Sequence, residues 1–231
     1  MSPDAALSAP AGTASDEALG YTLWAVLRRD RAQRAGTGDL APTLATVAAS
    51  GVTVRGFYDV SSIRADADLM VWLHGPAPER LQAALRTLRR SDPFATLLPT
   101  WNVLGVHREA EFNAAHLPAF LRGLPPQRWL TVYPFVRSYD WYLLPADERR
   151  AMLADHGRKG ASHHSVLSNT VAAFGLGDYE WILALEAPEL VDLVDLMRHL
   201  RETEARRHVR LETPFYVGRR IEVDEIAEVL A

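Results

Sequence analysis

The feature that most constrains the fold of this chain is a pattern of strands and helices that occurs twice. The first copy begins with the alternating run Tyr21–Arg29, and the second begins with a similar run at 128–137. Alternation of apolar and polar residues is typical of strands. In the first copy we predict a helix at 40–50, strands at 52–60 and 67–73, a helix at 79–90 and a strand at 101–108. The corresponding elements of the second copy are predicted at 145–156, 170–174, 179–185, 189–204 and 215–221.

This order predicts an α+β protein built from two β-α-β-β-α-β units, in which helices cover one face of each antiparallel sheet. The long helix of each copy carries an apolar stripe, which is typical of a helix that packs on a sheet. The stripes consist of Leu81, Leu85 and Leu88, and of Leu190, Leu193, Val194, Met197 and Leu200. We predict an N-terminal arm at 1–18, a first ferredoxin-like unit at 19–108, a linker at 109–127 and a second ferredoxin-like unit at 128–231.

The arm and the linker differ in composition. Residues 1–18 are rich in Ala, Ser, Pro and Gly, which predicts a disordered segment, and they lack the basic and apolar regions of a signal peptide. The linker carries His116 and an apolar face, and Pro125-Pro126 ends this face. The face consists of Phe112, Leu117, Phe120 and Leu121. We expect the linker to fold over the open face of the second sheet.

Charge and composition exclude several classes of function. A net charge of −4 gives no reason to expect nucleic acid or an anionic membrane as a partner. The chain has no cysteine, which excludes disulfides, thiolate zinc sites and thiolate haem ligation. This absence also fits a reducing cytoplasm, the location that we predict. No apolar run approaches the roughly 18 residues of a membrane span.

One stretch of the second copy brings together four side chains with useful chemistry. Tyr133 and Arg137 lie on the predicted first strand, Trp141 follows it, and His156 ends the next predicted helix. The stretch therefore supplies an oxidisable phenol, a guanidinium, an indole and an isolated imidazole. Each also has an ordinary structural interpretation, since strand tyrosines and tryptophans often only pack in a core.

We predict that the helix before His156 begins at Pro145, where a missing N–H has no cost, and ends with Gly157 as a left-handed cap. Met152 and Leu153 precede His156 by about one turn, so the imidazole is expected to share their buried face. A lone histidine in an apolar setting suits a single axial ligand better than a zinc site, which needs three or four ligands. The alternative is a histidine that merely caps helix carbonyls.

Four segments together resemble the coproheme decarboxylases of the chlorite dismutase-like superfamily, in their actinobacterial form. The resemblance covers roughly residues 20 to 222. It rests on Tyr-Pro-Phe-Val-Arg at 133–137, Asp-His-Gly-Arg-Lys-Gly at 155–160, Gly-Leu-Gly-Asp-Tyr-Glu-Trp at 175–181 and Pro-Phe-Tyr-Val-Gly at 214–218. It implies that the two units join into a dimeric α+β barrel, that only the second unit keeps the cofactor, and that five chains form a homopentamer.

The resemblance also implies roles for the candidate residues. His156 would bind the iron from the proximal side, and Tyr133 would be the redox-active tyrosine. His116 would be the distal base that deprotonates hydrogen peroxide, a task that suits a neutral imidazole. Arg137 and, less clearly, Arg206 would hold propionates of the porphyrin. Trp141 is expected at the porphyrin edge, with a plain core position as the alternative.

The implied reaction is the hydrogen peroxide-dependent oxidative decarboxylation of two propionates of iron-coproporphyrin III (coproheme). Coproheme would be both substrate and redox centre, and haem b the product, in haem biosynthesis. A transient contact with the coproporphyrin ferrochelatase is a partner that the resemblance suggests. The alternatives are a chlorite dismutase or peroxidase on the same fold, and a haem-binding protein without chemistry.

Two further expectations concern residues outside these roles. Asn169 stands where chlorite-degrading relatives carry a distal arginine, which disfavours that chemistry, and either Ser168 or Asn169 could line the pocket. The remaining histidines of the second copy are predicted to lie on the polar surface. They are His163, His164, His199 and His208.

Overall fold

The computed structural model describes residues 20–108 and 117–231. We call the elements from β1 to β4 the first unit and those from β5 to β9 the second unit. The first unit consists of β1 Tyr21–Arg29, α1 Ala41–Ala49, β2 Thr53–Asp59, β3 Leu69–Gly75, α2 Pro78–Arg90, the 3₁₀ turn Asp92–Phe94 and β4 Leu97–Val106. These bounds confirm the predicted elements of the first copy to within a few residues at each end.

The second unit repeats this order and adds short elements. It consists of β5 Trp129–Arg137, the 3₁₀ turn Trp141–Leu143, α3 Ala146–Ala161, β6 Leu167–Ala172, β7 Trp181–Ala187, α4 Leu190–Leu200, η3 Glu204–His208, β8 Val209–Leu211 and β9 Tyr216–Ile221. The chain ends with the turn Val223–Glu225 and α5 Ile226–Val229. No helix in the described part of the chain is long and apolar enough to cross a membrane.

The two units share one strand arrangement, and all their ladders are antiparallel. The strand orders are β4-β1-β3-β2 and β9-β5-β7-β6, which correspond position by position. The register corresponds as well, because Tyr21 pairs with Gly75 as Trp129 pairs with Ala187. The units are joined where β2 pairs with β9 and β4 meets β6. Together with the pairing of β5 and β7, these contacts close the sheet on itself.

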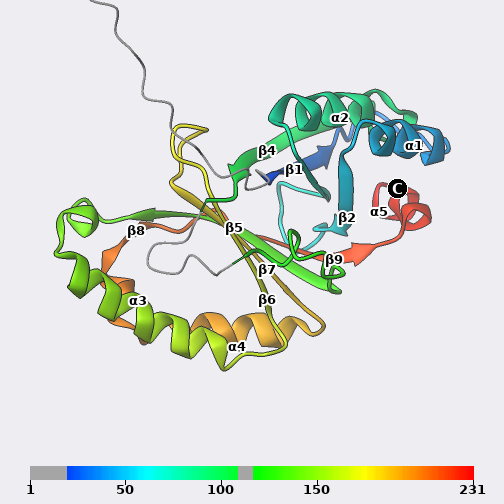
Figure 1. The fold of residues 1–231 in the computed structure, drawn as a ribbon. Coiled ribbons are helices and arrows are strands. Elements are labelled where there is room, and N and C mark those ends of the chain that lie inside the picture. The colour runs from blue at the N-terminus through cyan, green and yellow to red at the C-terminus, as the bar shows by residue number, and fades with distance from the viewer. Residues whose placement is uncertain (1–19, 109–116) are drawn as a thin grey trace, which may run out of the picture.

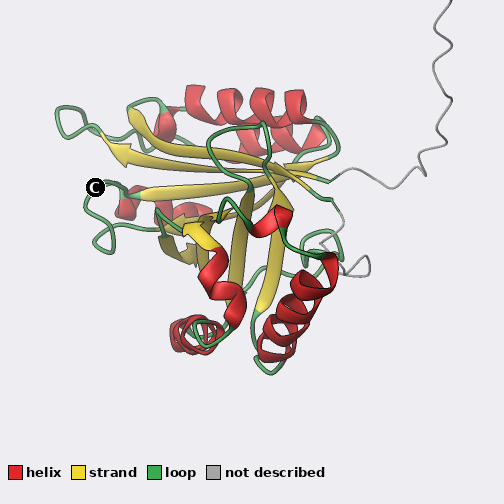
Figure 2. Ribbon diagram, turned by 90° about the vertical axis from the view of Figure 1, so that its left-hand side faces the viewer, coloured by secondary structure: helices red, strands yellow, loops and turns green. Residues whose placement is uncertain are grey.

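The helices lie outside this sheet in two separate layers (Figure 1). Helices α1 and α2 cover the first unit at one end of the molecule, and α3 and α4 cover the second unit at the other end. Figure 2, turned by 90°, shows the same two layers with the strands between them. Helix α5 returns to the first unit, where Ile226 and Leu230 join its core.

The interior of the closed sheet is a core that both units share. Trp24 and Trp72 are fully buried there with ring centroids 5.1 Å apart, and Leu130 and Val132 of β5 contact the same cluster. Each large apolar side chain buried in this way stabilises the fold by roughly 1.5–3 kcal/mol. Because residues of both units form this core, we infer that the units fold together.

The linker contributes to the shared core through its last part. Phe120 is 4% exposed and lies against Trp72 and His74, with ring centroids 6.1 Å and 5.1 Å away. The backbone N–H of Ala119 donates a hydrogen bond to the Ser168 carbonyl of β6. The described part of the linker therefore contacts the first unit as well as β6 of the second unit, over whose open face we expected it to fold.

Helix α3 differs from its prediction at both ends. Pro145 is the residue before the helix, and the helix continues past Gly157 to Ala161, so His156 does not lie in the last turn. Gly157 in a helix costs about 1 kcal/mol relative to Ala. Lys159 helps to hold the longer helix, because its Nζ donates a hydrogen bond to the Glu202 carbonyl at 2.9 Å. The predicted helix 189–204 is shorter in the structure, where α4 ends at Leu200.

Candidate functional site

Strand β5 places Tyr133 on the face of the second unit that α4 covers. Side chains alternate along a strand, so Leu130 faces the shared interior and Tyr133 faces the helix. The Tyr133 ring stacks on Phe215 with centroids 4.5 Å apart, and its hydroxyl donates a hydrogen bond to Met197 Sδ at 3.5 Å. Burial raises the pKa of Tyr133, and the Glu212 carboxylate raises it further. The phenol therefore keeps its proton at neutral pH.

Helix α3 carries His156 in a half-buried position, as it does Met152 and Leu153. Burial lowers the pKa of His156, and the positive charge of Arg137 lowers it further. No residue within 20–108 or 117–231 forms a hydrogen bond with the ring. The structure thus holds a neutral imidazole, which is the form that binds a metal.

A charged cluster brings Tyr133 and His156 into one neighbourhood. Glu212 forms ion pairs with Arg201 at 2.8 Å and with Arg206 at 2.7 Å, and its side chain is 13% exposed. Its negative charge raises the pKa of both Tyr133 and His156, while the two arginines lower that of Tyr133. Electrostatic effects on a pKa weaken with distance. The fold therefore brings Glu212 near both Tyr133 and His156, although these residues are far apart in sequence.

The Arg137 guanidinium lies on an aromatic support. Its central carbon is 4.0 Å from the centre of the Trp141 ring, a cation–π contact. Its backbone N–H donates to Glu180 Oε2 at 2.9 Å, which fixes the end of β5. Trp141 is fully buried, and His208 packs on it with ring centroids 5.3 Å apart. In this structure the indole supports Arg137, and contact of Trp141 with a porphyrin stays a prediction.

His116, the predicted distal base, lies outside the described residues, so its role stays a prediction. Asn169 does not line the site. It is fully buried, its amide donates to Ala184 O and Glu186 Oε1, and its Oδ1 accepts from the Phe120 N–H. Asn169 pairs with Ala184, which faces the shared interior, whereas Tyr133 faces α4. Since side chains alternate, we expect Ser168 or Thr170 of β6 to face the site instead.

Three histidines that we predicted on the polar surface are partly buried, and only His164 is exposed. Nδ1 of His208 lies 3.1 Å from Ser138 Oγ and 3.6 Å from a carboxylate oxygen of Asp140. His163, which follows α3, pairs with His199 of α4, with Nε2 and Nδ1 3.1 Å apart. The partners in each pair lie 36 or 70 residues apart in the chain, which explains why a local sequence pattern did not reveal them.

Sequence reasoning also missed Arg201 and Glu212, which join the charged cluster with Arg206. The available signal was the pattern of acidic and basic residues between α4 and β9. This pattern does not reveal which charges meet, because the segment folds back through η3 and β8. Arg206, in contrast, was singled out in sequence and lies in the cluster.

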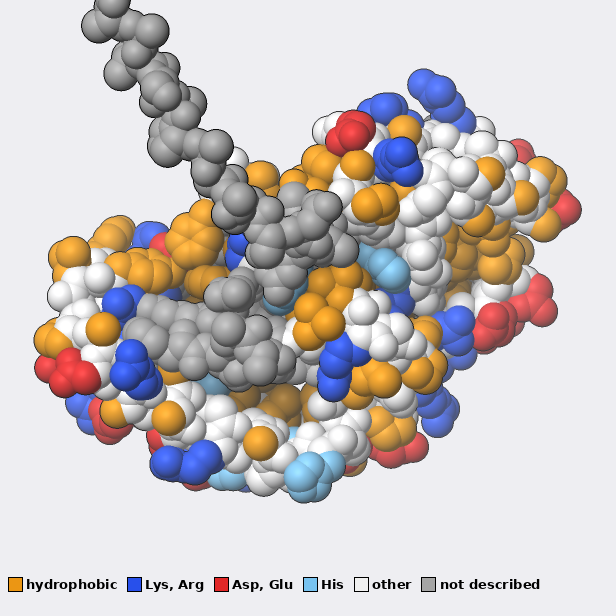
Figure 3. Space-filling model, viewed as in Figure 1, with side chains coloured by type: hydrophobic (Ala, Val, Ile, Leu, Met, Phe, Trp, Pro, Cys, Tyr) orange, Lys and Arg blue, Asp and Glu red, His pale blue; other side chains and the backbone are white. Residues whose placement is uncertain are grey.

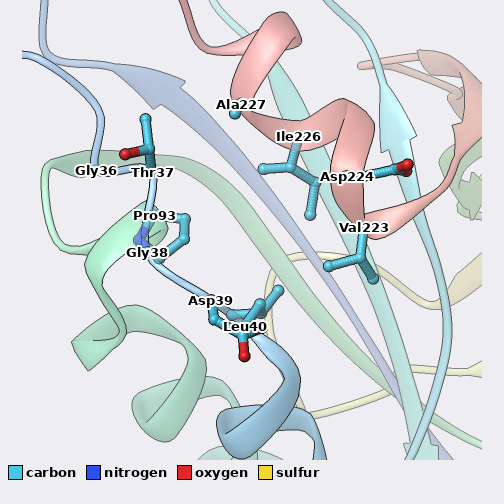
Figure 4. Close-up of a pocket in the computed structure, with 10 residues that line it drawn as sticks. All are labelled: Gly36, Thr37, Gly38, Asp39, Leu40, Pro93, Val223, Asp224, Ile226 and Ala227. Carbon is cyan, nitrogen blue, oxygen red and sulfur yellow. The ribbon is translucent and has the colours of Figure 1, made fainter.

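Two hollows lie near the surface, and they differ in character. An apolar groove of about 290 Å³ lies between α4, β5 and β9, and its lining includes Met197 and Phe215, which contact Tyr133. Arg198 and Arg201 are also part of its wall. The other hollow, of about 210 Å³, lies in the first unit between the loop 36–40, Pro93 and the C-terminal turn (Figure 4). Its lining includes none of Tyr133, Arg137, Trp141, His156 and Arg206.

Large apolar side chains are exposed around the far end of the second unit. Those of Tyr139 and Leu143 are 81% and 85% exposed, beside the start of α3. The space-filling view in Figure 3 shows that hydrophobic side chains gather at this left-hand end of the molecule. Among the described residues, no group of three or more metal-binding side chains converges.

Comparisons with known proteins agree with this description. The model of the chlorite dismutase family matches residues 33–221. A coproheme decarboxylase of Mycolicibacterium smegmatis is 55% identical over 177 residues, which cover 76% of this chain and 77% of that protein. A coproheme decarboxylase of Staphylococcus saprophyticus is 22% identical over 193 residues, 77% of each chain. A crystal structure of a putative chlorite dismutase has a TM-score of 0.77 at 25% identity and covers 92% of this chain and 99% of its own.

These matches extend over both units and over the segments that form the site. The α+β class with an antiparallel sheet is confirmed by the structure and by its solved neighbours. The sequence, the fold and the relatives lead to one conclusion: the chain belongs to the chlorite dismutase family.

Proposed function

We propose that this protein is a coproheme decarboxylase, which converts iron-coproporphyrin III to haem b with hydrogen peroxide as oxidant. The observation that carries the proposal is that Tyr133, which is buried against Met197 and Phe215, and His156 of α3 are both affected by the charge of Glu212, which pairs with Arg206. The relative that is 55% identical bears the name coproheme decarboxylase, which supports a role in haem biosynthesis.

The described residues fit the proposed substrate. Coproheme is a flat apolar macrocycle with an iron centre and four carboxylates. His156 offers an imidazole without a hydrogen-bond partner among residues 20–108 and 117–231. Arg137 acts on the pKa of His156, and Arg206 pairs with Glu212, which acts on it as well. Guanidinium groups recognise carboxylates through charge-assisted hydrogen bonds. The second unit, at 128–231, is therefore the porphyrin-binding unit in our proposal.

The corresponding position of the first unit has no comparable chemistry. Aligning β1 with β5 places Ala25 opposite Tyr133, and both are the fifth residue of a nine-residue strand. Ala25 is fully buried in a core that apolar side chains fill, among them Leu73 and Leu81. This packing supports the proposal that only the second unit binds the cofactor.

Peroxide and the porphyrin iron supply the oxidising power, and we propose that Tyr133 transmits it. The Tyr133 hydroxyl loses a proton together with an electron, because burial beside Glu212 disfavours a free phenolate. The resulting tyrosyl radical takes a hydrogen atom from a propionate β-carbon. A second electron then passes from the propionate to the oxidising equivalent that remains from the same peroxide, which releases CO₂, leaves a vinyl group and completes the reduction of that peroxide to two waters. Two propionates react in turn, so two peroxides are consumed and two CO₂ are released.

His116 is proposed as the base that accepts the proton of peroxide. Arg137 and Arg206 are proposed to orient propionates, so that one of them faces Tyr133. The homopentamer, the cytoplasmic location and the contact with the ferrochelatase remain predictions from the resemblance. Size measurement of the purified protein tests the first of them directly.

The proposal is tested by mixing purified protein with iron-coproporphyrin III and adding peroxide in steps. A decarboxylase yields a three-propionate intermediate and then haem b, and the porphyrin mass falls in two steps, each by one CO₂ and two hydrogen atoms. A chlorite dismutase or peroxidase leaves the porphyrin mass unchanged while it consumes chlorite or an added electron donor. A haem-binding protein without chemistry binds the porphyrin and consumes neither oxidant.

A further inference from the structure

The sulfur of Met197 is in direct contact with the tyrosine that we propose to be oxidised. Met197 Sδ accepts the hydrogen bond of the Tyr133 hydroxyl at 3.5 Å. Helix α4, which carries Met197, lies on the outside of the second unit (Figure 1). A thioether is a weak acceptor, so this contact holds the hydroxyl only loosely. A chemical change at the sulfur therefore acts directly on the Tyr133 hydroxyl.

Met197 is also within reach of small solutes. It is half-buried and lines the apolar groove of about 290 Å³ between α4, β5 and β9. A water molecule takes up about 30 Å³ of liquid, so the groove has room for hydrogen peroxide, which is little larger. Peroxide is the oxidant of the proposed reaction, and it converts a methionine thioether to the sulfoxide.

The wall of the groove favours this oxidation. The sulfur lone pair attacks one oxygen of hydrogen peroxide, the O–O bond breaks and an S–O bond forms. The departing hydroxide takes the proton of the new S–O–H group and leaves as water, so the sulfur loses the two electrons that the peroxide gains. Arg198 and Arg201 belong to the same wall as Met197, and guanidinium donors stabilise the negative charge of a departing hydroxide.

The sulfoxide holds the Tyr133 hydroxyl more firmly than the thioether does. Its oxygen is a much better acceptor than sulfur, and a hydrogen bond between two oxygens is about 2.7 Å long. The 3.5 Å between Met197 Sδ and the phenol oxygen is close to what a bent S–O···H–O arrangement needs, so neither Tyr133 nor α4 has to move far. A hydroxyl held in this way gives up its hydrogen less readily, which slows the oxidation of Tyr133.

The other methionines of the chain provide internal references. Met70 is fully buried in the shared core, whereas Met152 is half-buried on α3. Oxidation of Met70 therefore reports on unfolding, and oxidation of Met152 shows what half-burial alone permits. The fourth methionine, Met1, lies outside the described residues.

We propose that Met197 is a peroxide-sensitive modification site, and that its oxidation to the sulfoxide slows haem b formation by restraining the Tyr133 hydroxyl. The modification itself needs only peroxide and the groove, whereas its effect on turnover rests on the proposed function. Methionine sulfoxide reductases return the sulfoxide to the thioether. The oxidant of the reaction thus limits its own use, and the limit is reversible.

The first measurement is the rate of oxidation at each methionine. The whole chain is treated with hydrogen peroxide without porphyrin, the excess is removed, and peptide mass spectrometry gives the sulfoxide fraction at positions 70, 152 and 197. We expect Met197 to be oxidised several-fold faster than Met152, because guanidinium donors line its groove. Met70 should stay reduced.

The second measurement is haem b formation per bound coproheme, before and after the same treatment. It compares wild type with Met197→Leu and with the matched control Met152→Leu, since leucine conserves the volume of methionine and is well tolerated. Each protein is compared with its own untreated sample. Wild type and Met152→Leu should lose turnover several-fold, and Met197→Leu should keep its own. Reductases for both sulfoxide epimers should restore wild type.

Three results would overturn the inference. They are a sulfoxide that forms no faster at 197 than at 152, full oxidation of Met197 with unchanged turnover, and an equal loss of turnover in treated Met197→Leu. Failure of the proposed function looks different, because untreated wild type would then form no haem b. The effect on turnover falls in that case, while the order of methionine oxidation still tests the modification site.

Discussion

Acid should destabilise the fold through His74, which lies near the end of β3. Its ring lies 5.1 Å from that of Phe120 and close to the Arg55 guanidinium. Burial, and then the charge of Arg55, lower the pKa of His74 from 6.5 to about 4. The unfolded chain therefore takes up this proton near pH 6.5, whereas the folded chain takes it up only near pH 4. The contribution of the neutral His74 ring to the free energy of unfolding is complete above pH 6.5 and is lost as the pH falls toward 4.

The size of the effect follows from this difference. At 1.36 kcal/mol for each pH unit, a pKa of about 4 in place of 6.5 corresponds to about 3 kcal/mol. Because the ring keeps part of its surface in water, we discount this to about 2 kcal/mol. Urea denaturation at several pH values between about 7.5 and 4.5 measures it in wild type and in His74→Gln.

Over this range, the free energy of unfolding of wild type should fall by about 2 kcal/mol more than that of His74→Gln. The comparison removes the contribution of His156, whose pKa is also lowered by burial and by Arg137, because both proteins contain it. Parallel curves for wild type and variant would refute the reasoning. They would mean that His74 binds its proton equally well in the folded and unfolded chains.

Two further predictions concern the porphyrin site. His156→Ala should weaken coproheme binding at least 10-fold and change the ferric absorption spectrum, because His156 is the proposed iron ligand; an unchanged spectrum in a titration would assign the iron to another residue. His116→Ala should bind coproheme normally in the same titration but form haem b about 100-fold more slowly. In wild type the rate should fall as the pH drops through the pKa of that histidine, and loss of binding with intact turnover would make His116 structural.

The sequence allowed most of the fold to be predicted, because its local patterns agree with the final contacts. The nine residues of β1 were predicted to the residue, and β5 to within one, since alternating apolar residues continue to the arginine that ends each strand. The helix around His156 was predicted too short. Gly157 was interpreted as a cap, but contacts of Lys159 with the chain beyond α4 extend the helix to Ala161.

The site was predictable where the chemistry is local and not where it depends on distant partners. Tyr133, Arg137 and His156 stand out through their spacing, and the structure places all three in one neighbourhood. Of Ser168 and Asn169, the two residues considered for the pocket, Asn169 lies on the face of β6 opposite to that of Tyr133, which only the strand pairing reveals. Arg55 and Glu186, which form a buried ion pair, lie 131 residues apart, so only the closed sheet reveals their pairing.

The central claim is that Tyr133 is oxidised during the reaction, and Tyr133→Phe tests it most directly. Phenylalanine keeps the ring that stacks on Phe215 and removes the hydroxyl that bonds Met197 Sδ at 3.5 Å. The loss of this single hydrogen bond should cost no more than about 1 kcal/mol of stability. Coproheme binding should therefore persist.

The decisive measurement is the porphyrin mass after a few equivalents of peroxide, in Tyr133→Phe and wild type side by side. We predict that wild type loses two CO₂ and forms haem b, whereas the variant consumes peroxide and bleaches the porphyrin without decarboxylation. Formation of haem b by Tyr133→Phe at near wild-type rate would contradict the radical role of Tyr133 and the mechanism built on it.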